Sequence, residues 1–311
     1  MITLLSDFGY QDAYVSIMKG VIAAIAPSET TCDLTHAISP QDILSARFNL
    51  KIAYPHFPSE TVHLAVVDPG VGSARRAVAI RCQRDDWACF LVGPDNGIFS
   101  GIVEDFLEDS SSSITAVTLT NSRYWRSKMT AESLSSTFHG RDIFAPVAAH
   151  LANGVAIESL GDRIDPDSLV SANIRSFEVL VNNSWPHFIN AVDTKSRKFN
   201  PRSDGESVKN DRKVLAVGCI QYVDRFGNLI SNIPEQAVSD IAWHVWLDVP
   251  FDQALISGIK TYSDAKADDV AALVGSHGWV EIACNCGSAS AYFEESGGVP
   301  VGTMAAIVTG Q

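Results

Sequence analysis

Short apolar runs alternate with amphipathic stretches along the first half of the chain. The apolar runs with the length and composition of buried strands lie at residues 2–5, 62–67, 77–81 and 89–92. The stretches with apolar residues at helical spacing lie at residues 14–26, 40–54 and 142–152. Strands that alternate with helices in this way predict an α/β domain built on a mainly parallel sheet.

The second half of the chain has a different pattern. A polar stretch over residues 181–212 lacks apolar periodicity, which is typical of a linker or a long loop. Beyond it, turn residues separate short apolar runs at 214–223, 229–233, 245–249, 279–284 and 303–308. Such runs predict a smaller, mainly β domain. We therefore expect an N-terminal α/β domain over residues 1–180, a connection over 181–212 and a C-terminal β domain over 213–311.

Composition narrows the class of ligand. Hydrophobic residues make up 46% of the 311 residues and charged residues 19%, which is enough apolar material for two cores. A formal net charge of −13 without a Lys/Arg-rich stripe argues against nucleic-acid binding. No run is long enough for a membrane helix, and no basic region precedes the first apolar run. We expect a cytoplasmic protein that binds neither membranes nor nucleic acid.

The six cysteines include no C-x-x-C pair and lie mostly inside apolar runs. We expect buried free thiols and no structural zinc site, because such a site needs clustered cysteine and histidine ligands. The sequence thus predicts no metal and no cofactor.

Three predicted strands are followed closely by a carboxylate, at Asp7, Asp68 and Asp95. Ligands of parallel α/β sheets bind beyond the carboxyl ends of the strands, so these positions are candidates for a site. A carboxylate such as Asp7 can accept hydrogen bonds from the two hydroxyls of a ribose. The same residue could instead cap the following helix or stabilise a turn.

The segment from Asp68 to Arg75 is the most unusual of the three strand ends. Gly70 and Gly72 allow the backbone to approach a ligand, while an acid and a guanidinium stand seven residues apart. The spacing permits an Asp–Arg pair that lines one pocket. An ordinary turn with a surface ion pair is the alternative.

Two further segments combine residue types that can bind or react. His139 lies at the entrance of the helix predicted from Asp142, where an imidazole can reach a ligand, although a lone histidine can also be structural. Asp224, Phe226 and Asn228 surround a glycine and could hold a base and a cation. A β-hairpin turn would use the same residue types.

Four motifs in order give the chain a family resemblance. They are Ser6-Asp7-Phe8-Gly9, Val67-Asp68-Pro69-Gly70-Val71-Gly72, Phe138-His139-Gly140-Arg141-Asp142 and Asp224-Arg225-Phe226-Gly227-Asn228. Together they resemble the S-adenosylmethionine hydroxide adenosyltransferases, the water-using relatives of the fluorinase and chlorinase enzymes. The resemblance implies cleavage of S-adenosylmethionine by water at C5′ to give adenosine and methionine. It also implies a C-terminal β-barrel-like domain and a homotrimer whose active sites lie at subunit interfaces.

The resemblance also implies roles for individual residues. The catalytic set falls on Asp68, Arg75 and His139, and the ribose-binding acid falls on Asp7. The remaining substrate contacts fall on Asp12 and Asp224 at the methionine side, on Phe226, Asn228, Tyr262 and the backbone near Cys286 and Gly287 around adenine, and on Ser276 near the amino-acid end. Two features depart from the family: the long polar connection at 181–211, and His277 where the halogenases have an arginine.

Three alternative functions compete with the hydrolase hypothesis. A 5′-halogenase would use chloride or fluoride, but the Asp68, Arg75 and His139 set argues against a pocket stripped of acid and base. A non-catalytic sensor would bind S-adenosylmethionine or adenosine without turnover. A metal-dependent phosphoesterase could be built on the strand-end aspartates. Neither of the last two explains four motifs in order.

Overall fold

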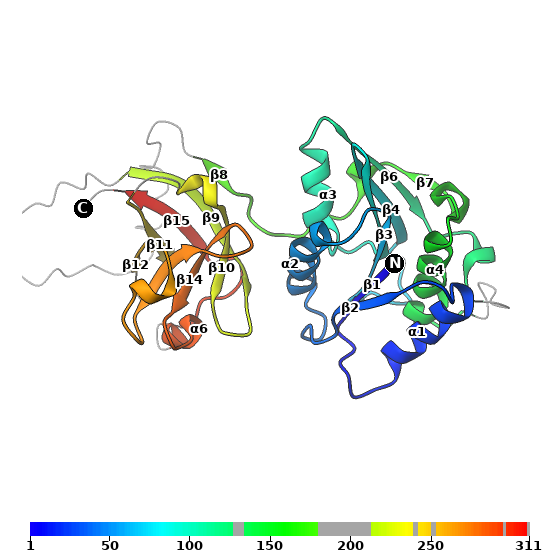
Figure 1. Ribbon diagram of the computed structural model, residues 1–311, viewed down its shortest axis with the longest axis horizontal. Coiled ribbons are helices and arrows are strands. Elements are labelled where there is room, and N and C mark those ends of the chain that lie inside the picture. The colour runs from blue at the N-terminus through cyan, green and yellow to red at the C-terminus, as the bar shows by residue number, and fades with distance from the viewer. Residues whose placement is uncertain (127–133, 180–212, 239–241, 250–252, 295–296, 310–311) are drawn as a thin grey trace, which may run out of the picture. The chain divides into compact units, whose positions relative to one another are not determined.

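The computed structural model describes residues 1–126, 134–179, 213–238, 242–249, 253–294 and 297–309 (Figure 1). The chain divides into two compact units, Met1–Asn173 and Ile174–Gln311. The predicted connection at 181–212 lies outside the described residues. Its bounds and the predicted boundary at residue 180 therefore stay predictions.

Unit 1 is built on a sheet that has seven strands among the described residues. The strands are β1 (Ile2–Ser6), β2 (Thr31–Thr35), β3 (Thr61–Val66), β4 (Ala77–Arg84), β5 (Trp87–Pro94), β6 (Ser112–Thr118) and β7 (Arg163–Ile164). Their order is β2-β1-β3-β5-β4-β6-β7, and only β4 and β7 run against the other five. The predicted α/β class with a mainly parallel sheet is confirmed.

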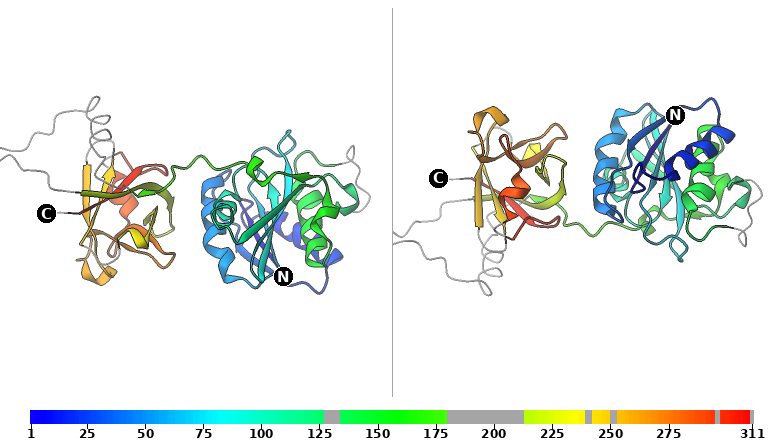
Figure 2. Two further views of the ribbon diagram at one scale, coloured as in Figure 1. Left: turned by 90° about the horizontal axis from the view of Figure 1, so that it is seen from above. Right: turned by 90° about the horizontal axis from the view of Figure 1, so that it is seen from below.

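Helices cover both faces of this sheet (Figures 1 and 2). They are α1 (Tyr14–Ile25), α2 (Ile43–Ala53), α3 (Ser100–Leu107) and α4 (Ala145–Ala152), with one π-helical segment at Gly140–Phe144. Met18 and Ile22 of α1 pack with α4 in the core of one face, and Leu50 of α2 packs with Ile102 and Phe106 of α3 in the core of the other. Within the described ranges, no helix has both the length and the apolar character needed to cross a membrane.

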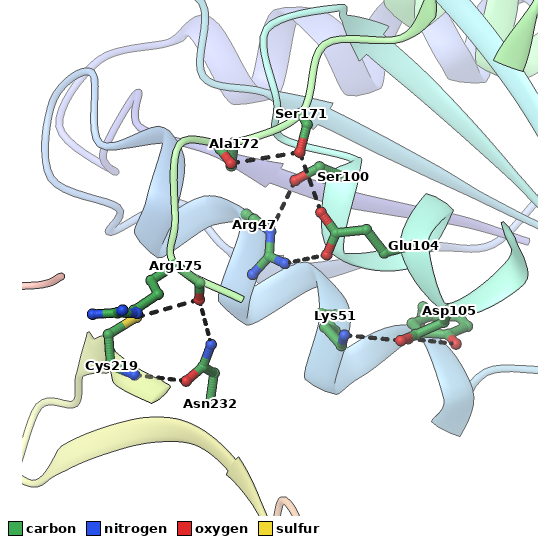
Figure 3. A network of polar contacts seen from close by, with 11 residues as sticks. Arg47, Lys51, Ser100, Glu104, Asp105, Ser171, Ala172, Arg175, Cys219 and Asn232 are labelled. Carbon is green, nitrogen blue, oxygen red and sulfur yellow. Dashed lines mark hydrogen bonds and ion pairs between the residues drawn. The ribbon is translucent and has the colours of Figure 1, made fainter. Parts of the chain in front are cut away.

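A polar network joins α2 to α3 at the edge of the second core (Figure 3). The guanidinium of Arg47 donates from Nε to Ser100 Oγ at 2.9 Å and from Nη2 to Glu104 Oε2 at 2.7 Å. One turn further on, Lys51 Nζ donates to Asp105 Oδ1 at 2.8 Å. The Arg47 side chain is buried, so these partners offset the cost of removing its charge from water.

The strand order creates a topological switch point between β1 and β3. From β1 the chain crosses over α1 to β2 on one side, and from β2 it crosses over α2 to β3 on the other side of β1. Ser6 and Val66 are paired in register, so both strands end at the same edge of the sheet. Open α/β sheets bind ligands in the crevice at such a point. The loops that carry Asp7 and Asp68 begin there.

Unit 2 is an antiparallel sheet that nearly closes into a barrel. Its strands are β8 (Glu178–Val179), β9 (Lys213–Val223), β10 (Leu229–Pro234), β11 (His244–Asp248), β12 (Gln253–Ser257), β13 (Val270–Val274), β14 (Trp279–Cys284) and β15 (Met304–Thr309). The order is β12-β11-β15-β9-β10-β14-β13, with β8 paired to β9. A bridge between Gly258 and Ala272 brings the two edges together. A short helix, α6 (Ala289–Tyr292), contributes Ala289 to the core.

The residues directly before β8 belong to unit 2 rather than to the α/β unit. The carbonyl of Arg175 accepts a hydrogen bond from Asn232 Nδ2 at 2.7 Å and one from Cys219 Sγ at 3.6 Å (Figure 3). β8 then pairs with β9 at Val217 and Ala216. These contacts explain why the division between the units falls before Ile174.

A buried histidine in unit 1 predicts a specific pH dependence of stability. His63 on β3 is fully buried, its Nδ1 lies 2.8 Å from Thr3 Oγ1, and burial lowers the pKa of His63 from 6.5 to about 4. The unfolded chain binds this proton near pH 6.5 and the folded chain does not, so stability should be complete above pH 6.5 and decline as the pH falls to 4. The loss should be about 3 kcal/mol.

Urea denaturation of the wild type and of His63→Leu between pH 4 and pH 7 checks this expectation. The other titrating groups contribute equally to both proteins, so the difference between the two free energies of unfolding isolates His63. As the pH falls, the wild type should lose more stability than the variant does. A difference that stays constant across the range would contradict the assignment.

Candidate active site

Asp68, Arg75 and His139 meet beyond the carboxyl end of β3. The Nε atom of Arg75 donates to Asp68 Oδ1 at 2.9 Å, and its Nη2 atom donates to the second carboxylate oxygen. The same Nη2 atom lies 2.8 Å from Nδ1 of His139. The guanidinium therefore bridges the carboxylate and the imidazole. It also lies over the ring of Phe144, with Cζ 5.2 Å from the ring centre.

Glycines fold the loop that carries Asp68 and Arg75. Gly72 has φ +77°, and a Cβ atom there would lie 2.4 Å from the carbonyl oxygen of Ser136. A side chain at this position would therefore push the loop away from the segment that leads into His139. At Gly70 a Cβ atom would crowd the Arg75 side chain at 3.2 Å. The two glycines thus allow the loop that carries Asp68 and Arg75 to lie close to the segment that leads into His139.

His139 lies at the N-terminal end of the π-helical segment that leads into α4. Burial and the positive charge of Arg75 lower the pKa of His139, and nearby carboxylates offset only part of this effect. A guanidinium can only donate hydrogen bonds, so Nδ1 of His139 is the acceptor. The imidazole is therefore neutral and carries its hydrogen on Nε2.

Asp142 anchors the segment around His139. Its side chain is fully buried and accepts hydrogen bonds from Arg141 at 2.6 and 2.8 Å and from the Ser135 N–H at 3.2 Å. Arg126 Nε lies 2.9 Å away as an ion-pair partner. Burial by itself raises the pKa of Asp142, but hydrogen bonds from Arg141 and Ser135 outweigh it, so the pKa is lowered. Asp142 is a first-turn acid of the π-helical segment, as the sequence allowed.

Asp7 lies in the loop after β1 and does not cap α1, whose N-cap residue is Ala13. Its Oδ2 atom accepts a hydrogen bond from the Gln41 N–H at 2.8 Å, so part of its role is to brace two loops. The side chain remains partly accessible, and a ribose-binding role stays a prediction. Asp12, predicted at the methionine side, is exposed.

An aromatic cluster beside these residues was not predicted from the sequence. The rings of Phe8, Tyr14 and Phe138 lie with centres 5.2–5.9 Å apart. The first and third motifs therefore meet in space through Phe8 and Phe138. The sequence does contain a signal for this cluster, because Phe8 directly follows Asp7 in the first motif and Phe138 directly precedes His139 in the third.

Asp95, the third strand-end carboxylate, has a structural role. It is buried and forms an ion pair with Arg76, whose Nε donates to Asp95 Oδ2 at 2.7 Å. Its other oxygen accepts from the Val170 N–H at 2.9 Å. Neighbouring arginines thus have different partners: Arg75 joins the candidate site, and Arg76 fastens the chain near the end of unit 1.

In unit 2, Asp224 and Asn228 form the turn between β9 and β10. Asp224 Oδ1 accepts from the N–H groups of Phe226 and Asn228, each at 2.8 Å, and its Oδ2 accepts from Asn228 Nδ2 at 3.0 Å. The hairpin interpretation of this motif is therefore correct, and any contact with substrate is additional to it. Phe226 at the tip is 75% exposed, which leaves its ring available to a ligand.

Tyr262 belongs to a polar cluster around the buried Glu281 of β14. The Tyr262 hydroxyl donates to one oxygen of Glu281, and His277 Nε2 lies 3.0 Å from the other. Burial and this hydrogen bond raise the pKa of Tyr262, and the nearby Asp224 carboxylate adds to the effect. Glu281 pairs with Ile230 near the start of β10, so the cluster lies near the β9–β10 turn. The sequence alone did not place Glu281 or His277 in a cluster with Tyr262, because a single acid within an apolar strand gives little indication of a polar site.

Cys286, Gly287 and Ser276 lie in turns that flank β14. Cys286 has φ +64° and is exposed, so the expectation of buried thiols is wrong at this position. Cys82, Cys89 and Cys219 are buried as expected, whereas Cys32 and Cys284 are only partly buried. Gly287 is exposed, and its N–H donates to the carbonyl of Cys284 at 3.1 Å. Ser276 is exposed. Their roles as substrate contacts stay predictions.

Both units match sequence models of one family. Residues 2–161 match the N-terminal domain of SAM hydroxide adenosyltransferases, and residues 218–301 match the C-terminal domain. The (R)-S-adenosyl-L-methionine hydrolase of Thermus thermophilus is 33% identical over 297 residues, which is 96% of each chain. The hydrolase of the same name from Salinispora tropica is 41% identical over 173 residues, 54% of this chain and 59% of that protein. A fluorinase of an Actinoplanes species is 26% identical over 189 residues, 55% of this chain and 60% of that protein.

Two solved structures share the fold of this chain over nearly its whole length. A structure of an uncharacterized conserved protein from Thermotoga maritima superposes with a TM-score of 0.76 at 30% identity, and covers 99% of this chain and 100% of its own. A structure of a conserved hypothetical protein from Thermus thermophilus superposes with a TM-score of 0.67 at 30% identity, with 98% of each chain covered.

Proposed function

This chain belongs to the SAM hydroxide adenosyltransferase family, and from that premise we infer that it is an S-adenosyl-L-methionine hydrolase that forms adenosine and methionine. The observation that carries the proposal is the bridged set of Asp68, Arg75 and His139 at the topological switch point of the sheet. Two relatives of this chain carry the name (R)-S-adenosyl-L-methionine hydrolase, and we propose that this chain acts on the same form of the substrate.

The reaction is a displacement at the ribose C5′ carbon. A bond forms between the oxygen of water and C5′, while the bond between C5′ and the sulfonium breaks and its electron pair stays on sulfur. The leaving group is a neutral thioether, so it needs no acid. The attacking water, whose ordinary pKa is near 15.7, also loses a proton, which is released to the solvent as the bond between oxygen and C5′ forms. Catalysis therefore depends on how the protein holds and polarises that water.

The three residues can divide this task. Asp68 still has lone pairs beyond those used by Arg75, so its carboxylate can accept a hydrogen bond from the attacking water. The Arg75 guanidinium can stabilise negative charge that develops on the water oxygen. His139 is neutral and presents an Nε2–H, which suits a donor that orients the water rather than a base. As the bond to C5′ forms, the negative charge that develops on the water oxygen and the positive charge of the sulfonium neutralise each other. A pocket that excludes other water therefore favours the reaction.

We propose that the reaction uses no metal and no cofactor. The positively charged guanidinium of Arg75 already neutralises Asp68 and occupies Nδ1 of His139. A divalent cation at these ligands would have to displace it against charge repulsion. Activity that survives treatment with a chelator would support this, and activity restored only by added metal would contradict it.

The proposal includes a homotrimer and a cytoplasmic location, both supported by the family resemblance. The cysteines found free in the described ranges fit a reducing compartment. Light scattering of the purified protein tests the assembly, since a homotrimer has three times the chain mass of 33.5 kDa. A mass of one chain would contradict it.

Product analysis separates the hydrolase from the competing functions. Purified protein is incubated with each sulfonium epimer of S-adenosylmethionine in metal-free buffer, with and without chloride or fluoride. We expect adenosine and methionine in equal amounts from the (R) form, with no dependence on halide. Formation of 5′-halo-adenosine would identify a halogenase, and tight binding of intact substrate would identify a sensor.

A further inference from the structure

Both ends of the loop over residues 6–9 are attached to one residue, His36. Ser6 Oγ lies 2.7 Å from Nδ1 of His36, and the Gly9 N–H donates to the His36 carbonyl at 2.8 Å. Asp7 lies between these two attachments. The position of its carboxylate therefore depends on a histidine that follows β2, nearly thirty residues further along the chain.

His36 is held in turn by a charged pair. The His36 ring is fully buried, and its Nε2 atom lies 3.2 Å from Asp33 Oδ1. Among the described residues neither atom has a hydrogen bond of ordinary geometry, so this ion-pair contact is the polar partner that the structure gives each of them. Lys19 Nζ of α1 donates to the other oxygen of Asp33 at 2.7 Å. A chain of polar contacts thus runs from α1 through the end of β2 to the end of β1.

The chemistry of the groups fixes the direction of each polar contact. An ionised carboxylate only accepts, so the ring hydrogen of His36 lies on Nε2 and points to Asp33. With the ring neutral, Nδ1 accepts from the Ser6 hydroxyl, whose oxygen also lies 3.3 Å from the Phe8 N–H. Burial lowers the pKa of His36 although Asp33 opposes this, which agrees with a neutral ring.

The set resembles a Ser–His–Asp arrangement but cannot act as a nucleophile. Ser6 and His36 are both fully buried, so neither can touch a substrate. Hydrogen bonds in such a buried site are strong, and a group left without its partner there is costly. The arrangement is therefore suited to holding a loop in one conformation.

We propose that His36, held by Asp33, is a positioning residue that fixes Asp7 in the orientation in which it binds the ribose of the substrate. The proposal rests on the proposed function, because the ligand of Asp7 is the nucleoside part of that substrate. The Gln41 N–H fixes Asp7 Oδ2 from one side, and the His36 network fixes the backbone of the loop from the other. The Asp7 carboxylate is thus held by the Gln41 backbone and by the His36 network before any ligand binds, which lowers the entropic cost of binding.

A thermodynamic cycle with adenosine tests the proposal. Calorimetry gives the Kd of adenosine for the wild type, His36→Leu, Asp7→Asn and the double variant. We expect each single variant to weaken binding by about tenfold or more. If His36 acts through Asp7, the double variant should bind no more weakly than Asp7→Asn alone.

Two further variants separate positioning from loss of folding. His36→Asn keeps an acceptor close to the position of Nδ1, so it should recover most of the affinity that His36→Leu loses. His63→Leu is a matched control, because it removes another fully buried histidine that contacts β1; it should lower stability and leave the Kd of adenosine unchanged. If His36→Leu does not fold, Ser6→Ala removes the same hydrogen bond and replaces it in the cycle.

The outcomes are distinct. Wild-type affinity in His36→Leu or Ser6→Ala, or losses that simply add in the double variant, would overturn the positioning role. So would wild-type protein that does not bind adenosine. Coupled losses in a protein that does not cleave S-adenosylmethionine would support the positioning role and contradict the proposed function alone.

Discussion

Replacing Arg75 with methionine should lower kcat for cleavage of S-adenosylmethionine by about a hundredfold or more, with a much smaller change in KM. Without the guanidinium, Asp68 and His139 lose the group that aligns them, and the attacking water loses the positive charge beside it. Arg75→Lys should recover little, because an ammonium cannot make the two-sided contact of a guanidinium fork. Steady-state kinetics of product formation measure both effects.

The neighbouring arginine supplies the control for this experiment. Arg76→Met removes a guanidinium of the same kind, one residue further on, whose partners are Asp95 and Ser168. It should reduce stability and leave kcat close to the wild-type value. Equal losses of kcat in the two variants would show that the effect comes from disturbance of the loop, and would remove Arg75 from the reaction.

Asp142→Ala should reduce the free energy of unfolding by about 3 kcal/mol. The Asp142 carboxylate is fully buried, and its removal leaves Arg141 and Arg126 without the acceptor that compensates their charge. The Ser135 N–H also loses its partner, so the segment before His139 should loosen and kcat should fall as well. Urea denaturation measures the first effect.

The exposed Asp12 provides the comparison for stability. Asp12→Ala removes an exposed carboxylate from the same unit. The free energy of unfolding of this variant should therefore stay within about 0.5 kcal/mol of the wild-type value. A loss as large as that of Asp142→Ala would mean that net charge, rather than the buried cluster, controls the stability of this unit.

The architecture was largely predictable because hydrophobic patterning reflects burial. Each of the predicted strands and helices of unit 1 is found, with ends moved by a few residues. β2 and β6 were missed because they are only partly buried and carry few continuous apolar residues. α3 was missed because Gly101 near its start lowers helix propensity; a Cβ atom there would crowd Arg47 and Lys51 of α2.

The candidate site was predictable only in part, because its members are brought together by tertiary structure. The Asp68–Arg75 pair followed from a spacing of seven residues, whereas His139 joins Arg75 across 64 positions and was placed there by family resemblance. Residue types alone did not assign Asp224 and Asn228 to a ligand site, since hairpin turns and ligand sites use the same residue types, and only the family resemblance gave them substrate contacts. The His36 network gave no signal, because a histidine and a serine at strand ends are common in proteins that lack such a contact.

Cleavage in water enriched in heavy oxygen shows directly whether water is the nucleophile. The protein is incubated with S-adenosylmethionine in this solvent, and both products are analysed by mass spectrometry, with Arg75→Met as the comparison. We expect one heavy oxygen at the 5′-hydroxyl of adenosine, unlabelled methionine, and little of either product from the variant. Adenosine without the label, or labelled product formed equally fast by Arg75→Met, would contradict it.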